Sequence, residues 1–276
     1  MTARAMTLDE LRDVLGWARA EGWNPGFADA EAFHATDPEG FLLAEIDGAP
    51  AAAISVVRHA PDVGFLGLYI CRPEHRGRGV GFGLWKAGMA RLEGVRVGLD
   101  GVVAQQDNYR RSGFALSHRN LRFTGRLAGA PCAEARPIDD ALRAAILARD
   151  AEVAGYARPA FLRAWMAPCA TRHALALVRD GALRGYGAIR ACVEGSKIGP
   201  LFAESRAEAE ALLGALAALA PEGPVALDLP EPNAEAVAMV EALGMAPAFE
   251  TARMWRGPAP AEDLRRVFGV ATFELG

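Results

Sequence analysis

The chain has 276 residues, a length that suits two domains of ordinary size better than one. Hydrophobic residues make up 51% of it and charged residues 23%, so the composition predicts buried cores and excludes wholesale disorder. The formal net charge is −4 and no block of Lys or Arg stands out, which argues against nucleic acid as the main partner.

The spacing of the cysteines and the length of the apolar runs indicate in which cell compartment the protein is expected. The four cysteines are far apart and include no Cys-x-x-Cys pair, so we expect neither a metal site nor a disulfide framework. The N-terminus is charged where a signal peptide would be apolar, and the longest apolar run, Ala211–Ala220, is too short to span a bilayer. Arginine replaces lysine almost everywhere and alanine is abundant, which is typical of G+C-rich bacterial genomes. The sequence therefore predicts a cytoplasmic bacterial protein with no membrane partner.

The first half of the chain alternates helices and strands. Thr7-Leu8-Asp9-Glu10 is a capping box, which predicts the start of a helix. Asp47-Gly48 separates two strand-like runs and predicts a tight hairpin, because Gly readily takes the positive φ of such a turn. The predicted elements are helices ending at Ala20 and covering Asp29–Ala35, a hairpin of Phe41–Ile46 and Ala51–Val57, strand Val63–Cys71, helix Val80–Leu92, strand Val95–Val103, a helical turn Asp107–Ser112 and strand Phe114–Thr124.

The second half follows the same order of elements. After a Gly/Ala/Pro-rich joint at Gly125–Pro137, a second Asp-Gly turn at Asp180-Gly181 again predicts a hairpin. The predicted elements are helices Asp139–Asp150 and Pro159–Met166, a hairpin of His173–Arg179 and Ala182–Ala191, strand Lys197–Ala203, helix Ser205–Ala220, strand Val225–Leu229, helix Asn233–Leu243 and strand Ala248–Arg256.

Three kinds of landmark recur at a nearly constant spacing. The intervals are 133, 128 and 131 residues, from Asp47 to Asp180, from Asp100 to Asp228 and from Gly113 to Gly244. We infer two copies of one unit, a first domain over residues 1–127 and a second over residues 128–276. Because hairpins are embedded among alternating helices and strands, the fold class is α/β (α+β), with a mixed, mostly antiparallel sheet flanked by helices in each copy.

A glycine-rich stretch between a strand and a helix is the most informative motif. Arg76-Gly77-Arg78-Gly79-Val80-Gly81-Phe82-Gly83 follows Arg72-Pro73-Glu74-His75. Glycines at a helix N-terminus expose backbone N–H groups, and the helix dipole and the arginines add positive potential, so the stretch predicts a phosphate or pyrophosphate site. It is not a P-loop, which needs Gly-Lys-Ser/Thr, nor a Gly-x-Gly-x-x-Gly dinucleotide loop. The alternative is a glycine-rich turn that only tightens the joint between strand and helix.

In this glycine-rich motif and the residues before it, the sequence resembles the Gcn5-related N-acetyltransferase (GNAT) superfamily. The signature Arg/Gln-x-x-Gly-x-Gly/Ala stands here as Arg76 to Gly81, preceded by Cys71-Arg72-Pro73-Glu74. The resemblance covers residues 4–125 well and the second copy more weakly, as in a two-domain bacterial type. It implies acetyl-CoA as co-substrate and no metal. The implied cofactor-binding residues are Tyr69, Ile70, Cys71, Arg76, Gly77, Arg78, Gly79, Val80, Gly81 and Phe82.

Acyl transfer needs an oxyanion contact and a proton donor. The backbone N–H groups of Ile70 or Cys71 are placed to polarise the thioester carbonyl. In this superfamily a tyrosine four residues before a Gly-Phe pair protonates the departing sulfur, and Tyr109 fits that pattern; its alternative is a ring that only packs the last helix. The Asn that the family usually carries seven residues earlier is Val102 here. Direct transfer is favoured over an acyl-enzyme on Cys71, because no activating base is evident.

The general base is the least defined part of the site. Asp100 occupies the place of the base in one subgroup of the superfamily, and Glu45 is a weaker candidate. The alternative for Asp100 is a carboxylate that fixes local backbone, because Asp228 repeats the feature in a copy that lacks the other catalytic parts.

The second copy lacks the phosphate loop. Its corresponding segment, Phe202–Glu208, has no glycine, and Ser205 and Glu208 form a capping box that occupies the helix N–H groups. We expect a non-catalytic unit that walls the substrate cleft together with Trp23 and Asn24, and that is a candidate surface for a homodimer. The stretch Gly195–Pro200 is a candidate for substrate contacts.

The sequence thus predicts an acetyl-CoA-dependent N-acetyltransferase. Its acceptor is expected to be a primary amine of a small molecule or a peptide, which attacks directly in a ternary complex. The alternative is a non-catalytic acyl-CoA binding or sensing protein, which would have no need of the proton donor Tyr109.

Overall fold

The computed structural model describes residues 2–276. The predicted elements of copy one (residues 2–127) occur in the predicted order, after a first strand, β1, that was not predicted. Thr7 and Glu10 form the capping box of the first helix. Asp47 and Gly48 both have positive φ, as the predicted two-residue turn requires. The elements are β1 (Thr2–Ala5), α1 (Leu8–Ala20), α2 (Asp29–Thr36), β2 (Phe41–Ile46), β3 (Ala49–Ala60), β4 (Val63–Cys71), α3 (Val80–Arg91), β5 (Arg96–Val102), α4 (Gln106–Arg111) and β6 (Ala115–Gly125).

Copy two (residues 128–276) repeats this order and adds a C-terminal segment. The second Asp-Gly pair, Asp180 and Gly181, takes the same positive φ values as the first. The elements are β7 (Ala135–Pro137), α5 (Asp140–Ala154), α6 (Pro159–Trp165), β8 (Arg172–Arg179), β9 (Ala182–Ala191), β10 (Ser196–Ala203), α7 (Arg206–Ala217), β11 (Val225–Pro230), α8 (Ala234–Ala242), β12 (Ala246–Arg256) and β13 (Val267–Gly269).

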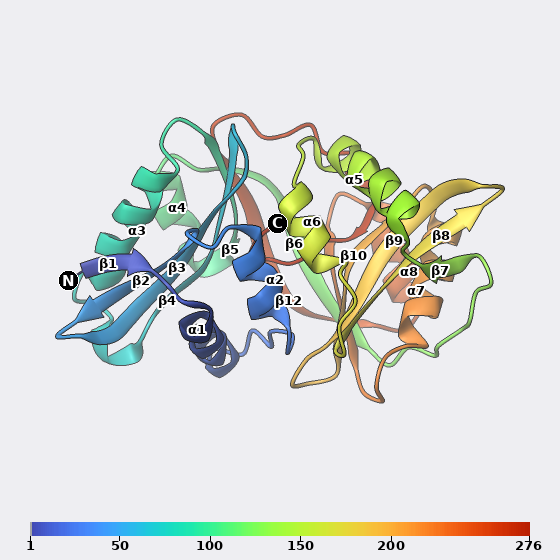
Figure 1. The fold of residues 1–276 in the computed structure, drawn as a ribbon, viewed down its shortest axis with the longest axis horizontal. Helices are drawn as coiled ribbons and strands as arrows, with labels where there is room; N and C mark the ends of the chain where they lie inside the picture. The colour runs from blue at the N-terminus through green and yellow to red at the C-terminus, as the bar shows by residue number, and fades with distance from the viewer. Residues whose placement is uncertain (1) are drawn as a thin grey trace.

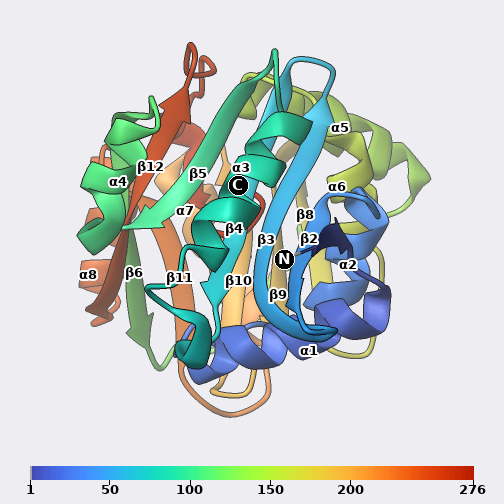
Figure 2. The same cartoon turned by 90° about the vertical axis from the view of Figure 1, so that its left-hand side faces the viewer.

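The two copies share one sheet, because each contributes its last long strand to the other. The strand order is β1-β2-β3-β4-β5-β12-β6-β11-β10-β9-β8-β7, with β13 paired to β10. Strand β12 therefore lies between β5 and β6, and β6 lies beside β11, as Figures 1 and 2 show. The only parallel pairs among the described strands are β4 with β5 and β10 with β11. The mixed, mostly antiparallel class is confirmed, but the two predicted sheets are joined into one.

A buried ion pair fixes each exchanged strand. Arg253 on β12 donates from Nε and Nη2 to the two oxygens of Asp100 on β5, at 2.8 and 2.7 Å. Arg122 on β6 binds Asp228 on β11 in the same way, at 2.6 and 2.7 Å. Because bidentate pairs require one relative orientation of the two groups, these contacts set the register of the exchange.

The faces of the sheet bury different helices. Because neighbouring residues of a strand point to opposite faces, Ile54 and Val56 of β3 pack in the core beneath α3, whereas Ala53 and Val57 pack in the core that contains α1 and α2. This second core also includes residues of α5 and α6, and the rings of Phe33 in α2 and Trp165 in α6 stack with centroids 5.8 Å apart. Copy one and copy two are therefore packed together through a common apolar core.

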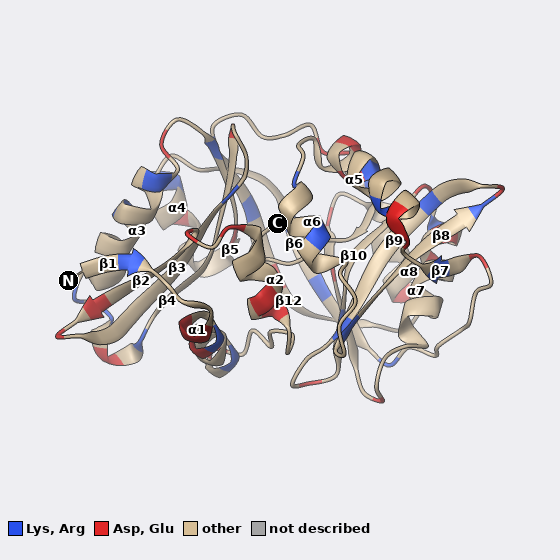
Figure 3. Cartoon of the chain, viewed as in Figure 1, with Lys and Arg blue, Asp and Glu red and all other residues tan. Residues whose placement is uncertain are grey.

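Charge is distributed over both copies. Figure 3 shows Lys and Arg interspersed with Asp and Glu along the chain. None of the helices described between residues 2 and 276 is long and apolar enough to cross a membrane. The predicted boundary between residues 127 and 128 stays a prediction.

Candidate functional site

Strands β4 and β5 separate halfway along their length. Their parallel ladder runs from Val63 paired with Arg96 to Leu66 paired with Leu99, and β4 then continues to Cys71 without β5 as its neighbour. At the point of separation Leu68 has a φ of 44°, which is rare for a side chain of this size, and the register with β3 shifts there. The backbone groups of Tyr69, Ile70 and Cys71 consequently face a slot rather than a neighbouring strand.

The glycine-rich stretch forms the predicted nest at one end of this slot. Gly77 and Gly79 have φ of 72° and 79°, and Gly79 is the N-cap of α3 with no side-chain cap. The first N–H groups of α3, from Val80 to Phe82, therefore have neither an intrahelical partner nor a capping side chain at Gly79, although the N–H of Gly81 also faces the Cys71 thiol. A twelve-residue helix adds the positive end of its dipole to these donors, so the nest is suited to an anion such as a pyrophosphate.

The two arginines of the nest have different roles. Arg76 donates from Nε to the carbonyl oxygen of Cys71 at 2.8 Å and forms an ion pair with Glu21. These contacts tie the loop to β4 and to the end of α1. Arg78 is exposed, and we find no hydrogen bond or ion pair for it within residues 2–276. Arg78 is thus the guanidinium that remains available to a phosphate.

Tyr109 lies at the other end of the slot in an aromatic cluster. Its ring stacks on Trp85 with centroids 5.8 Å apart, and a Cβ at Gly101 of β5 would collide with it. Burial raises the pKa of Tyr109 to about 12, so the hydroxyl stays protonated at neutral pH. Gln105 and Asn108 line the cavity beside it.

The side chains of Cys71 and Tyr69 on β4 are not activated as nucleophiles. Burial raises the pKa of the Cys71 thiol, which therefore remains protonated at neutral pH. Burial also raises the pKa of Tyr69 to about 12, and its hydroxyl lies against Gly81, where no larger residue would fit without displacing it. Neither side chain is placed for nucleophilic attack, and the predicted role of their backbone groups toward the cofactor stays a prediction.

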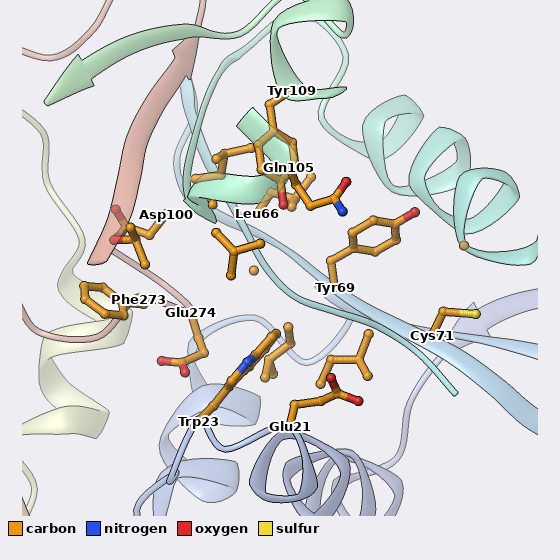
Figure 4. Close-up of a pocket in the computed structure, with 18 of the residues that line it drawn as sticks. Glu21, Trp23, Leu66, Tyr69, Cys71, Asp100, Gln105, Tyr109, Phe273 and Glu274 are labelled. Atoms are coloured by element: carbon orange, nitrogen blue, oxygen red, sulfur yellow. The ribbon is translucent and has the colours of Figure 1, made fainter. Parts of the chain in front are cut away.

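The slot opens into a cavity of about 1550 Å³ that both copies line. Figure 4 shows Tyr109 entering from α4, Trp23 from the loop after α1, and Phe273 and Glu274 from the C-terminal segment. Strands β6, β10 and β12 supply further walls. Copy one adds Arg122 and Thr124 of β6 to this lining, and copy two adds Lys197, Pro224, Phe249 and Thr251.

Trp23 and Asn24, the predicted substrate residues, both line this cavity, but their contacts differ. The side-chain amide of Asn24 is engaged at both ends with the backbone of Glu194, at 2.8 and 3.1 Å, so it clamps the loop to copy two. The carbonyl oxygen of Trp23 accepts a 2.7 Å hydrogen bond from Nζ of Lys197. Burial lowers the pKa of Lys197 to about 8.

The contacts of Asp100 argue against the role of general base. Asp100 lines the cavity, but its side chain is fully buried and both oxygens bind Arg253. Oδ1 also accepts a hydrogen bond from Asn120 at 2.8 Å. The Asp100 carboxylate thus binds the exchanged strand β12, just as Asp228 binds the exchanged strand β6. These contacts agree with the alternative, in which Asp100 is a structural residue. Glu45, the weaker candidate, pairs with Arg4 at 2.5 Å outside the cavity.

Copy two contains the same strand separation, but the chain itself fills it. The β10–β11 ladder ends at Ile198 and Leu227, at the positions equivalent to Leu66 and Leu99. Strand β13 enters there: it pairs with β10 at Leu201 and Phe202, and the N–H of Val270 donates to the carbonyl oxygen of Asp228 at 2.7 Å.

The helix that follows this filled slot has half of the predicted capping box, because the Glu208 carboxylate binds the Ser205 hydroxyl and not the Ser205 backbone N–H. The Ser205 side chain accepts a hydrogen bond from the Glu208 N–H, and the Glu208 carboxylate pairs with Arg184 at 2.6 Å. Copy two therefore offers neither a free nest nor a free slot.

Several cavity residues were not predicted. Phe273 and Glu274 come from a C-terminal segment with no recognisable motif. Arg122 lies in a strand that was predicted, but no site residue was expected on it. Lys197 lies in the stretch predicted to contact substrate. The chain has only two lysines, and this rarity is the signal that could have identified Lys197 as a site residue. Across residues 2–276, no three His, Cys, Asp or Glu side chains are grouped so that they could hold a metal ion.

Comparison with known proteins agrees with this geometry. The acetyltransferase (GNAT) family matches residues 8–114, and an acetyltransferase (GNAT) domain matches residues 146–269. A holothin acyltransferase from Pseudoalteromonas sp. (strain SANK 73390) is 30% identical over 283 residues, which cover 100% of this chain and 94% of the relative.

Two solved structures show the fold in similar chains. A putative acetyltransferase from Pyrococcus horikoshii superposes with a TM-score of 0.82 at 20% identity, over 100% of this chain and 95% of the other. A tandem GNAT protein from the clavulanic acid biosynthesis pathway gives 0.62 at 17% identity, over 93% and 99%. This chain belongs to the Gcn5-related N-acetyltransferase superfamily, as an acyltransferase with two GNAT domains, a family that generally uses acyl-CoA as co-substrate.

Proposed function

We propose that the protein transfers the acetyl group of acetyl-CoA directly to a primary amine. The observation that supports this most strongly is the unpaired half of β4, with the nest at one end and Tyr109 at the other. Copy two has no equivalent, so one acetyl-CoA would bind per chain.

Each end of the slot has a defined task in this proposal. The N–H groups of Gly77 to Phe82 and the free guanidinium of Arg78 hold the pyrophosphate. The pantetheine lies along Tyr69 to Cys71 as an added strand would. The N–H of Ile70 or Cys71 stabilises the charge that develops on the thioester oxygen, and Tyr109 donates its proton to the sulfur as the C–S bond breaks.

The acceptor occupies the part of the cavity that copy two lines. Phe249 is 40% exposed although it is a large hydrophobic residue, and Phe273 lies near it, with centroids 6.4 Å apart. An exposed aromatic surface inside a cavity favours a flat, apolar small molecule over a long charged peptide. The relative named as a holothin acyltransferase supports a small-molecule acceptor, and we propose that the amine acylated here is of that kind.

The test is release of CoA thiol from acetyl-CoA in the presence of holothin and a panel of small primary amines and amino-terminal peptides. We expect product carrying one acetyl group with a small-molecule amine, and no thiol release above the hydrolysis background with peptides. Acetyl-CoA should be compared with longer acyl-CoA thioesters in the same assay. A protein that binds acetyl-CoA but acylates nothing in the panel would favour the binding or sensing alternative.

The compartment is part of the same proposal. All four cysteines are free thiols, as a reducing environment would keep them. We propose a cytoplasmic location on this basis.

A further inference from the structure

An ammonium group must lose a proton before it can attack a thioester, and Asp100 is engaged elsewhere. Four carboxylates line the cavity: Glu21, Asp100, Glu194 and Glu274. Glu21 pairs with Arg76 and Asp100 pairs with Arg253, whereas Glu194 is exposed at the rim. Glu274 is half-buried, and we find no ion pair for it among the described side chains. Its carboxylate accepts a hydrogen bond from the hydroxyl of Thr272.

The backbone of the C-terminal segment places Glu274 at the apex of the slot. Its carbonyl oxygen lies against Gly67, where any Cβ would collide with it, and accepts a hydrogen bond from Ser55 Oγ at 3.4 Å. The next residue is anchored as well, because the Leu275 carbonyl oxygen lies 2.7 Å from His59 Nε2. Gly67 is three residues from Ile70, so the segment is fixed beside the backbone that would hold the thioester oxygen.

Glu274 and Tyr109 approach the site from different sides. In Figure 4 the tyrosine descends from α4, whereas the glutamate lies across the cavity from it, between Trp23 and Phe273. An acid on the leaving-group side and a carboxylate on the acceptor side are the two groups that direct transfer requires.

We propose that Glu274 is the general base of the reaction, an inference that rests on the proposed function. The carboxylate takes one proton from the acceptor's ammonium, directly or through one water. The freed nitrogen lone pair forms the C–N bond, the C–S bond breaks and the sulfur receives the proton of Tyr109. The second proton that the nitrogen then loses restores the Tyr109 hydroxyl through water. The proton on Glu274 then passes to solvent, so the overall products are an amide, free CoA and one proton.

The surroundings of Glu274 are polar and of mixed charge. Lys197 of β10 and Arg122 of β6 are the nearby cations. The negative charge of Glu274 acts to raise the pKa of each, and that of Asp228 on β11 acts in the same direction. Asp100 of β5 also lines the cavity, with its partner Arg253 behind it on β12, and Ser55 and Gly67 are the contacts on β3 and β4. The carboxylate therefore sits near compensated charges rather than in a dedicated ion pair.

Glu274→Gln tests the proposal, because it keeps the shape of the side chain and removes its basicity. With an alkylamine acceptor at neutral pH, we expect kcat/KM to fall by about 10²–10⁴-fold while acetyl-CoA affinity and Tm stay near wild type. The deficit should shrink as pH approaches the acceptor's own pKa, and it should be small for an arylamine or a hydroxylamine, which are unprotonated at neutral pH. Glu222→Gln, which neutralises an exposed glutamate outside the cavity, is the matched control and should behave like wild type.

A Glu274→Gln variant with the wild-type rate and pH profile would place the base elsewhere. If that variant is unstable, Glu274→Asp keeps a carboxylate and should retain the pH profile of wild type at a lower kcat; a profile that follows the acceptor's pKa would overturn the proposal. Failure of the proposed function is distinguishable, because then wild type itself makes no acetylated amine.

Discussion

Replacing Tyr109 by Phe isolates one hydroxyl group. The ring stack on Trp85 and the contact with Gly101 do not involve the oxygen, and the structure assigns no hydrogen bond to it within residues 2–276. Removing the oxygen should therefore change the free energy of unfolding by less than about 0.5 kcal/mol. Acetyl-CoA affinity should also stay the same, because the nest and the backbone of β4 are untouched.

The rate of acyl transfer should fall much further. Loss of a positioned proton donor lowers kcat by about 10²–10⁴-fold, equivalent to about 3–5 kcal/mol in the activation free energy. Since burial raises the pKa of Tyr109 to about 12, the donor is protonated across the working range, and wild type should show no loss of rate from Tyr109 below about pH 11.

The assay is single-turnover acetyl transfer, followed by thiol release, with acyl donors of graded thiol acidity. The defect of Tyr109→Phe should shrink for the more acidic thiols, because a better leaving group needs less protonation. Turnover equal to wild type with acetyl-CoA would show that the proton comes from water or another residue, and Tyr109 would then be a packing residue.

Three further predictions follow from the geometry. Calorimetry should find one acetyl-CoA per chain, abolished by Gly79→Val but not by Gly244→Val, which places the same side chain at a positive-φ glycine of copy two; two sites per chain would contradict the filled slot. Asp100→Asn and Asp228→Asn should each cost about 3–5 kcal/mol in urea unfolding, because each leaves a buried arginine unpaired; an Asp100→Asn protein that is stable but inactive would instead make Asp100 the base. Because burial lowers the folded-state pKa of Lys197 to about 8 from 10.5, the charged form destabilises the fold at neutral pH and the penalty is relieved as pH rises from 8 to 10.5. The free energy of unfolding of wild type relative to Lys197→Met should thus rise by about 3 kcal/mol across that window, and a flat difference would refute the shifted pKa.

The local elements were predictable because their signals are local. Capping residues and Asp-Gly turns act over two to four residues, and the structure has Thr7, Asp47 and Asp180 in the predicted roles. The nest was predictable for the same reason, since glycine at positions 77 and 79 is what its positive φ values require.

The strand exchange was not predictable from these signals. Strands β6 and β12 have similar patterns, and a strand's sequence does not state which neighbour it pairs with. A clue was present nonetheless: Asp100 and Asp228 are 128 residues apart, and their partners Arg253 and Arg122 are 131 apart. An aspartate and an arginine that both recur in the second copy indicate a repeated structural ion pair more strongly than a recurring aspartate alone.

The C-terminal part of the site was hidden for a different reason. Val267–Gly269 is too short to show a period of two, and Phe273 and Glu274 reach the cavity only because that strand is held between β10 and β11. Their position also depends on the contacts of Glu274 with Ser55 and of Leu275 with His59, which are 219 and 216 residues apart in the chain. A single sequence does not show such distant contacts.

The strand order has a consequence for how the two halves could come to differ. From either edge of the sheet, at β1 or at β7, equivalent strands follow one another in the same order. This is the arrangement of a two-fold dimer whose subunits exchange their last strands. In such a dimer both halves carry one sequence, so a change that closes one slot closes the other. Covalent linkage removes that constraint. Here one half has no glycines at the phosphate-loop position and holds β13 in its slot, while the residues that follow β13 line the slot that is open.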